Sequence, residues 1–294
     1  MSRIGVIGLG AMGQPIAAAL ATSGAEVRVF DVSTAAVQRA EVEGLRACAT
    51  VADLAAECDV VVLSLPTPAI VLDVVQQIAG ASTTTTVLDT STVDPSTSQA
   101  AAALLEGGGY GDCPVLGRPE AVGRWTVPVG GDERVAAVAA DVLAPVAARV
   151  VHVGDVGSAA AIKVLNNMML GTINAITAEV LLLAEAAGLD PGVFVDVVVD
   201  SGAASVSGLF RDVAARAVDG DFAATFSLAL MHKDNRLAMA MADAYGVPMV
   251  VGSATQTLNT LGLAAGHGSE DSIAVLKALE GLTGRTARRH GPRV

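Results

Sequence analysis

The pattern of apolar residues changes near residue 157, and this change constrains the fold more than any other feature of the sequence. Before it, short apolar runs rich in β-branched residues alternate with Ala-rich stretches. The predicted strands are Ile4–Ile7, Glu26–Phe30, Val60–Leu65, Thr86–Asp89, Thr126–Val129 and Arg149–Val153, and the helical stretches between them include Met12–Ser23, Thr34–Glu43 and Pro95–Glu106. Such alternation predicts βαβ units and a mainly parallel sheet with helices on both faces.

After Gly157 the sequence predicts only helices. A long stretch without a break, Ser158–Leu189, is followed by Gly192–Asp200, Leu209–Ala217, Phe226–Tyr245, Met249–Ala265 and Ser272–Leu282. We therefore expect an α/β domain over residues 1–157 and an all-α domain over residues 158–294 that begins with the long helix. The Arg-rich tail, Gly284–Val294, is expected to fray, as chain ends commonly do.

Composition excludes several classes of protein. Of 294 residues, 52% are hydrophobic and only 16% are charged, so the chain is not disordered. The 30 acidic residues outnumber the 18 basic ones, which argues against binding to nucleic acid or to an anionic membrane surface. Charges or turn residues interrupt the apolar runs, and the beginning of the chain lacks the pattern of a signal peptide, so we expect no membrane span. Cys48, Cys58 and Cys113 are odd in number and lack metal-site spacing, which favours the cytoplasm and no metal.

A glycine motif, Gly8-Leu9-Gly10-Ala11-Met12-Gly13, follows the first predicted strand and opens the first helix. By itself a G-x-G-x-x-G motif is a weak signal, but this strand–turn–helix context is that of a dinucleotide-binding, Rossmann-like domain. The helix N-terminus would offer amide groups and the positive end of its dipole to the phosphates. Asp31 ends the second strand, 18 residues after Gly13, where a carboxylate bonds the adenosine ribose.

The residues around Asp31 predict the choice of cofactor. Val32, Ser33 and Thr34 follow it, and none of them is a cation that could receive a 2′-phosphate. Because the Asp31 carboxylate would also repel that phosphate, we expect NAD to be preferred over NADP.

The long helix carries a row of polar residues, Lys163, Asn166, Asn167 and Asn174, on one arc of an otherwise apolar surface. An unpaired buried charge is costly, so Lys163 should face a polar site. Only three of the 18 basic residues are lysines, and lysine, unlike arginine, can release its proton at accessible pH. These features favour a binding site over a solvent-facing stripe.

A third group of polar residues, His232 to Arg236, by itself indicates a solvent-exposed helix face, where ion pairs contribute little to stability. The sequence contains no recognisable Ser/His/Asp triad, paired-carboxylate motif or His-rich metal motif. Without a metal, Lys163 is the best available proton donor.

With these pieces in place, the sequence resembles the β-hydroxyacid dehydrogenase family, which includes 3-hydroxyisobutyrate dehydrogenases and tartronate semialdehyde reductases. The resemblance extends from about Arg3 to Leu282. It is carried by the glycine motif and by five further segments: Asp59–Pro66 (DVVVLSLP), Asp89–Pro95 (DTSTVDP), Asp112–Val115 (DCPV), Lys163–Asn167 (KVLNN) and Phe226–Asp234 (FSLALMHKD).

The resemblance implies a Rossmann domain, a helical domain that exchanges contacts in a homodimer or homotetramer, and a small-molecule substrate. It assigns Lys163 as the catalytic general acid–base. The substrate-binding residues that we expect are Thr92, Leu116, Gly117, Arg118, Asn167, Phe226 and Asp234. The expected cofactor-binding residues are Gly8, Leu9, Gly10, Ala11, Met12, Gly13, Asp31, Val32, Leu65, Pro66, Thr92 and Lys233.

One segment departs from the family pattern. The family usually continues its Asp-Ala-Pro-Val segment with Ser-Gly-Gly, which holds the substrate carboxylate, whereas this chain has Leu116-Gly117-Arg118. The expected activity is therefore hydride transfer between a nicotinamide and a 3-hydroxy acid or semialdehyde, with the particular substrate left open.

Three alternatives stay open at this point. They are an imine reductase of the same superfamily, a 6-phosphogluconate-type dehydrogenase, and a non-catalytic dinucleotide-binding scaffold. An imine reductase usually has another residue in place of Lys163, and the helical part is short for a 6-phosphogluconate dehydrogenase. The pairing of Lys163 with Asn167 argues against a scaffold.

Overall fold

The structure, a computed structural model, describes residues 3–105, 107–201 and 207–290. The chain forms two compact units, Met1–Val164 and Leu165–Val294. The boundary expected at residues 157 and 158 is the start of helix α7 (Ser158–Ala186), and the two units divide inside that helix.

Within the described residues, the first unit contains one sheet of eight strands in the order β3-β2-β1-β4-β5-β6-β7-β8. Strands β1 to β6 are parallel to one another, β7 runs antiparallel to β6, and β8 is parallel to β7. The bounds are β1 Arg3–Ile7, β2 Glu26–Phe30, β3 Arg46–Ala47, β4 Val60–Leu63, β5 Thr86–Asp89, β6 Gly109–Asp112, β7 Trp125–Gly130 and β8 Ala147–Gly154. The expected α/β fold with a mainly parallel sheet is thereby confirmed.

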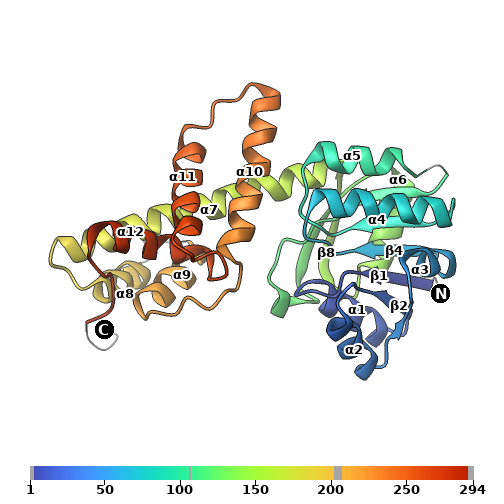
Figure 1. The fold of residues 1–294 in the computed structure, drawn as a ribbon, viewed down its shortest axis with the longest axis horizontal. Helices are drawn as coiled ribbons and strands as arrows, with labels where there is room; N and C mark the ends of the chain where they lie inside the picture. The colour runs from blue at the N-terminus through green and yellow to red at the C-terminus, as the bar shows by residue number, and fades with distance from the viewer. Residues whose placement is uncertain (1–2, 106, 202–206, 291–294) are drawn as a thin grey trace. The chain divides into compact units, whose positions relative to one another are not determined.

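Helices cover both faces of the sheet (Figure 1). Strand β4 shows why, because its side chains point alternately into two cores: Val60 and Val62 into one, Val61 and Leu63 into the other. The first core includes residues of α1 and α2, the second residues of α3 and α4. The helices of this unit are α1 Gly13–Thr22, α2 Thr34–Val42, α3 Val51–Glu57, α4 Pro68–Ala81, α5 Pro95–Ala103, the 3₁₀ turn η1 Pro119–Ala121 and α6 Glu133–Val142. Glu106, the last residue of the helix predicted from Pro95, lies outside the described residues.

The second unit is helical in its described residues. After the remainder of α7 come α8 Pro191–Ser201, α9 Gly208–Val218, α10 Leu228–Tyr245, α11 Val250–Ala264, the 3₁₀ turn η2 Ser272–Ala274 and α12 Val275–Thr283. Helix α7 is the one described helix whose length and apolar composition would allow it to cross a membrane. Because 56% of its most apolar window is buried inside the protein, and core helices of soluble proteins share these properties, this is weak evidence for a membrane span.

The described part of the C-terminal tail does not fray, so that expectation was wrong for residues 284–290; residues 291–294 lie outside the described part. Arg289 donates to Asp196 at 2.6 Å and to Asp219 at 2.9 Å, which ties the tail to α8 and to the end of α9. The backbone amide of His290 donates to Asp190 at 3.0 Å. Side-chain ion pairs between distant segments leave little signal in a linear sequence, so the basic tail looked merely solvated.

Replacing Arg289 with alanine should lower the free energy of unfolding by about 2 kcal/mol. This is less than the ~3–5 kcal/mol for a fully buried pair that loses one partner. The discount reflects Asp219, which is 34% exposed, whereas Arg289 itself is only 9% exposed. Urea denaturation checks this, with Arg285→Ala as a control because Arg285 is exposed on the same tail. Equal stability of the two variants would contradict the prediction.

Candidate functional site

The predicted site residues of the first unit follow the carboxyl ends of neighbouring parallel strands. The glycine motif follows β1, Asp31 and Val32 follow β2, Leu65 and Pro66 follow β4, Thr92 follows β5, and Leu116–Arg118 follow β6. These ends lie at one edge of the sheet, since the strands are parallel. The strand order reverses between β1 and β4, the point where open α/β sheets bind ligands.

Each glycine of the motif has a separate structural reason. Gly8 has a positive φ of +92°, and a Cβ there would meet the Ser64 carbonyl. A Cβ on Gly13 would collide with the Gly8 carbonyl, so the start of α1 packs closely on the turn. A Cβ on Gly10 would meet nothing within 4 Å, and this residue is exposed. The turn is therefore closed at Gly8 and Gly13 and open at Gly10, which fits the approach of a pyrophosphate to the backbone.

Asp31 also holds the glycine turn in place. Its carboxylate accepts hydrogen bonds from the Leu9 amide at 2.6 Å and from the Ser33 amide at 2.7 Å. Ser33, not Asp31, is the N-cap of α2. The Val32 side chain is 93% exposed, so it projects away from the protein core. Carboxylate oxygens accept more than one hydrogen bond each, so Asp31 retains acceptor capacity for a ribose hydroxyl.

The loops after β4 and β5 are joined by a buried hydrogen-bond network. The Leu65 amide donates to Ser91 Oγ at 2.9 Å, and the Ser91 amide donates to Asp89 Oδ1 at 2.9 Å. The Tyr110 hydroxyl donates to Asp89 Oδ2 at 2.7 Å. Burial raises the pKa of Asp89 above its usual range. This network fixes the backbone next to Pro66 and Thr92, and nothing in the sequence pattern marks Asp89 and Ser91 as its members.

Lys163 lies near the beginning of α7, within the first unit. Its Nζ donates to the Val115 carbonyl at 2.8 Å. Val115 immediately precedes Leu116, so the ammonium group lies beside the loop in which this chain departs from the family pattern. Lys163 itself is half-buried.

The loop from Leu116 to Arg118 is held by strand β7. Leu116 and Thr126 exchange two backbone hydrogen bonds, and Trp125 Nε1 donates to the Arg118 carbonyl at 2.7 Å. A Cβ on Gly117 would collide with the Trp125 ring. The backbone of this loop is therefore fixed, and the half-buried side chains of Leu116 and Arg118 extend from a rigid base.

In the second unit, Asn167, Lys233 and Asp234 form one cluster. Asn167 Nδ2 donates to Asp234 Oδ2 at 2.6 Å, and Lys233 Nζ lies 3.0 Å from Asp234 Oδ1. Asn166 Nδ2 donates to Asn167 Oδ1 at 3.1 Å. Asp234 is 1% exposed, so these polar partners offset the cost of burying its carboxyl group. Lys233 therefore belongs to a defined cluster, whereas its sequence context alone suggested a solvated face.

Other residues that the sequence analysis names have contacts outside this cluster. Asn174 donates to Ser272 Oγ at 2.6 Å, a contact between α7 and η2. Phe226 precedes α10, and its carbonyl accepts from the Ser272 amide at 2.9 Å. Lys277, one of the three lysines, forms an ion pair with Glu270 at 2.8 Å and lies over the Phe222 ring. Among the described residues, no group of three or more His, Cys, Asp or Glu side chains is arranged to hold a metal ion.

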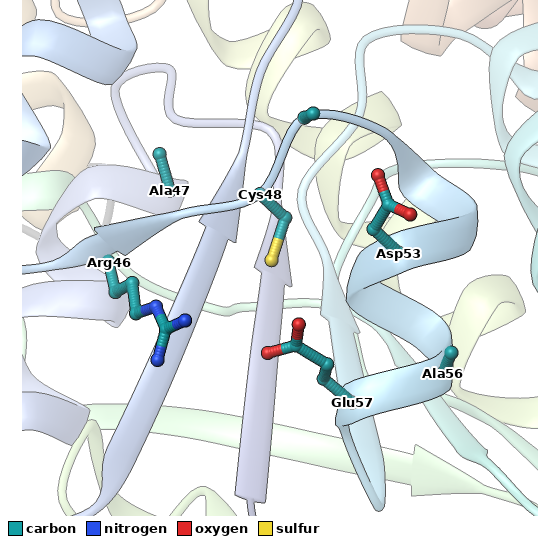
Figure 2. Close-up of a pocket in the computed structure, with 7 residues that line it drawn as sticks. Arg46, Ala47, Cys48, Asp53, Ala56 and Glu57 are labelled. Atoms are coloured by element: carbon teal, nitrogen blue, oxygen red, sulfur yellow. The ribbon is translucent and has the colours of Figure 1, made fainter.

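A hollow of about 300 Å³ lies at the sheet edge beside β3. Ala49 lines it together with the residues labelled in Figure 2, which are Arg46, Ala47, Cys48, Asp53, Ala56 and Glu57. Burial raises the pKa of the Cys48 thiol, so this cysteine is not an activated nucleophile. Glu57 is already paired with Arg28 at 2.8 Å. None of the predicted site residues lines this hollow.

Two family models together match most of the chain. The model described as the NAD binding domain of 6-phosphogluconate dehydrogenase matches residues 3–154. The model described as "NAD-binding of NADP-dependent 3-hydroxyisobutyrate dehydrogenase" matches residues 157–279. The chain belongs to the β-hydroxyacid dehydrogenase family. The predicted family is thus confirmed, and with it an NAD(P)-dependent oxidoreductase acting on CH–OH groups.

Relatives of this β-hydroxyacid dehydrogenase match over nearly their whole length. It is 34% identical to a 2-(hydroxymethyl)glutarate dehydrogenase of Eubacterium barkeri, over 96% of each chain. It is 32% identical to a 3-sulfolactaldehyde reductase of Escherichia coli, over 98% of this chain and 99% of the relative. A solved 3-hydroxyisobutyrate dehydrogenase of Mycobacterium tuberculosis matches with a TM-score of 0.86 and 32% identity, over 95% and 99% of the two chains. Imine reductase structures match at only 19–22% identity, which shows a shared fold alone.

Proposed function

We propose that this dehydrogenase interconverts a 3-hydroxy acid and the corresponding semialdehyde, with Lys163 as the general acid–base. The observation that carries the proposal is the position of Lys163. Its Nζ is held at the Val115 carbonyl, beside the loop of residues 116–118. Asn167 lies one turn further along the same helix, so it shares a face of α7 with Lys163.

NAD(P), when bound, supplies or accepts the hydride. The open backbone at Gly10 and the N-terminus of α1 would hold its pyrophosphate, and Asp31 would bond its adenosine ribose. Leu9, Ala11, Met12 and Val32 complete this binding surface in the proposal. Leu65, Pro66, Thr92 and Lys233 are assigned to the rest of the cofactor, as the resemblance implies.

Lys163 handles the proton. In reduction its ammonium group donates a proton to the oxygen of the substrate carbonyl as that oxygen becomes an alkoxide. In oxidation its neutral amine accepts the hydroxyl proton. A free lysine has a pKa of about 10.4, so the base form requires burial or nearby cations. The hydrogen bond to the Val115 carbonyl, which an ammonium or a neutral amine can donate, would keep Lys163 Nζ in place for either direction.

The substrate would contact Thr92, Leu116, Gly117, Arg118, Asn167, Phe226 and Asp234. Of these, Arg118 offers a planar fork of donors suited to an acid group. The relatives named for 2-(hydroxymethyl)glutarate and 3-sulfolactaldehyde act on anionic molecules, which supports an acid substrate here. Leu116 replaces a hydroxyl with apolar bulk and favours a substrate with an apolar substituent.

A panel of 3-hydroxy acids, semialdehydes and cyclic imines, assayed by nicotinamide absorbance with both cofactors, tests the proposal. Turnover of a hydroxy acid or semialdehyde is the expected result. Turnover of imines alone would overturn the substrate class. Cofactor binding without turnover across the whole panel would favour a non-catalytic scaffold.

NAD should be preferred over NADP by at least about tenfold in kcat/KM, which corresponds to about 1.4 kcal/mol. The reason is the Asp31 carboxylate, which would repel a 2′-phosphate, together with the uncharged residues Val32, Ser33 and Thr34. Steady-state kinetics with both cofactors on one accepted substrate measures this preference. A higher kcat/KM with NADP would show that Asp31 does not select the cofactor.

We also propose a homodimer or homotetramer built on α7. Leu165, Met169, Ile176 and Leu183 on this helix are 50–68% exposed and follow the spacing of one helical face. A second copy of the chain would cover this apolar face.

The three free thiols support a reducing compartment such as the cytoplasm.

A further inference from the structure

Asp112, the last residue of β6, holds the beginning of α7. Its Oδ1 accepts a hydrogen bond from the Gly157 amide at 2.8 Å, and its Oδ2 accepts one from the Ala160 amide at 2.7 Å. The carboxylate is 2% exposed, so water cannot replace these two donors. Nothing in the reaction proposed above uses this group.

The contact resolves two electrostatic problems at once. The first amides of a helix have no partner inside the helix, and its N-terminus carries a partial positive charge. A buried carboxylate likewise requires donors. The site is built for this residue, because a Cβ at Gly130 would come within 2.5 Å of Asp112 Oδ1. Gly157, whose φ is +98°, packs its backbone against Pro95.

We propose that Asp112 is the positioning residue for Lys163, fixing the first turn of α7 so that the lysine ammonium reaches the Val115 carbonyl. Ala160 lies one turn before Lys163, and Val115 lies three residues after Asp112. The segment Asp112–Val115 therefore holds α7 at two points, through amides at its first turn and through Lys163 Nζ one turn later. This inference rests on the proposed role of Lys163.

Titratable groups lie on several segments around Asp112, and one of them is His152 on β8, whose Nε2 is 2.7 Å from the Gly131 carbonyl. Asp89 is its register partner on β5, and burial raises the pKa of Asp89. Burial also raises the pKa of Tyr110 and of Cys113 well above their usual values. Asp155 lies in the turn before α7, and Arg118 lies in the loop after Val115. Among these neighbours, Tyr110 and Cys113 stay neutral through the pH range of an activity profile.

The test compares Asp112→Asn with Asp132→Asn in the full-length protein. Asp132 is the control, because its carboxylate caps a different helix, α6, through the Val135 amide at 2.7 Å. Asp112→Asn should lower kcat at least about tenfold, about 1.4 kcal/mol, relative to the control variant. It should also move the Lys163 limb of the pH profile to lower pH, because removing a negative charge disfavours the ammonium form. Hydrogen exchange should increase in residues 157–163 only in the Asp112 variant.

The outcomes separate this inference from the proposed function. Equal kcat and pH profiles in the two variants would overturn the positioning role of Asp112. If Lys163→Ala keeps its turnover, the proposed function fails. Hydrogen exchange then decides whether Asp112 holds the first turn of α7. Unchanged protection of residues 157–163 in Asp112→Asn would overturn this structural role of Asp112 as well. Asp112→Ser, with a smaller side chain that still accepts a hydrogen bond, replaces the Asn variant if the latter does not fold.

Discussion

Replacing Lys163 with alanine should lower kcat by about 10²–10⁴, the usual contribution of a positioned general acid–base. The variant loses the proton donor that we propose for the substrate oxygen, and it keeps the glycine turn, Asp31 and the loops after β4 and β5. Its affinity for the cofactor should therefore barely change. Stopped-flow or steady-state absorbance of the nicotinamide gives kcat, and quenching of Trp125 fluorescence or calorimetry gives cofactor binding.

Two further substitutions, each at a lysine, test this prediction more closely. Lys163→Arg should fail as well, because guanidinium keeps its proton and cannot act as a base. Lys277→Ala is the matched control, since Lys277 pairs with Glu270 and should leave kcat unchanged. Near-normal turnover of Lys163→Arg would show that Lys163 does not transfer a proton.

The sequence predicted the elements that follow a simple periodic pattern. Strands such as Glu26–Phe30 and Thr86–Asp89 begin and end as expected, because apolar β-branched runs are bounded by turn residues. Strand β6 was missed, since its sequence, Gly109-Tyr110-Gly111-Asp112, lacks such a run. Its glycines serve packing instead, because a Cβ at Gly109 or Gly111 would press on Val135 of α6.

The sequence could indicate candidate site residues where the chemistry depends on neighbours in sequence. The glycine motif and the spacing of Lys163 and Asn167 on one helix are such cases. The contacts of Asp112 with Gly157 and Ala160 join residues 45 and 48 positions apart, and no periodic pattern marks them. The scarcity of lysine was a mixed signal: Lys163 and Lys233 lie in polar clusters with Val115 and Asp234, whereas Lys277 has a structural ion pair.

Replacing Arg118 with alanine should raise the KM for an acid substrate by about 10–150-fold. This corresponds to about 1.5–3 kcal/mol for a hydrogen bond to a charged group. The Arg118 carbonyl is held by Trp125 Nε1, so truncating the side chain leaves the loop backbone in place. Arg124→Ala is the control, because Arg124 is an exposed arginine between η1 and β7. An unchanged KM, or the same change in the control, would remove Arg118 from substrate binding.

Leu116→Ser tests the other difference from the family pattern in this loop, the leucine in place of a serine. Leu116 is fixed to Thr126 by two backbone hydrogen bonds, so the substitution changes the side chain and not the path of the loop. The new hydroxyl restores the group with which the family holds the substrate carboxylate, and the loss of apolar bulk removes a surface for apolar substituents. Preference should shift toward small 3-hydroxy acids, measured as the ratio of kcat/KM for an unsubstituted and an alkyl-substituted substrate. If this ratio stays the same in Leu116→Ser and in Arg118→Ala, the loop is structural, and substrate choice is then assigned to the other proposed contacts, Thr92, Asn167, Phe226 and Asp234.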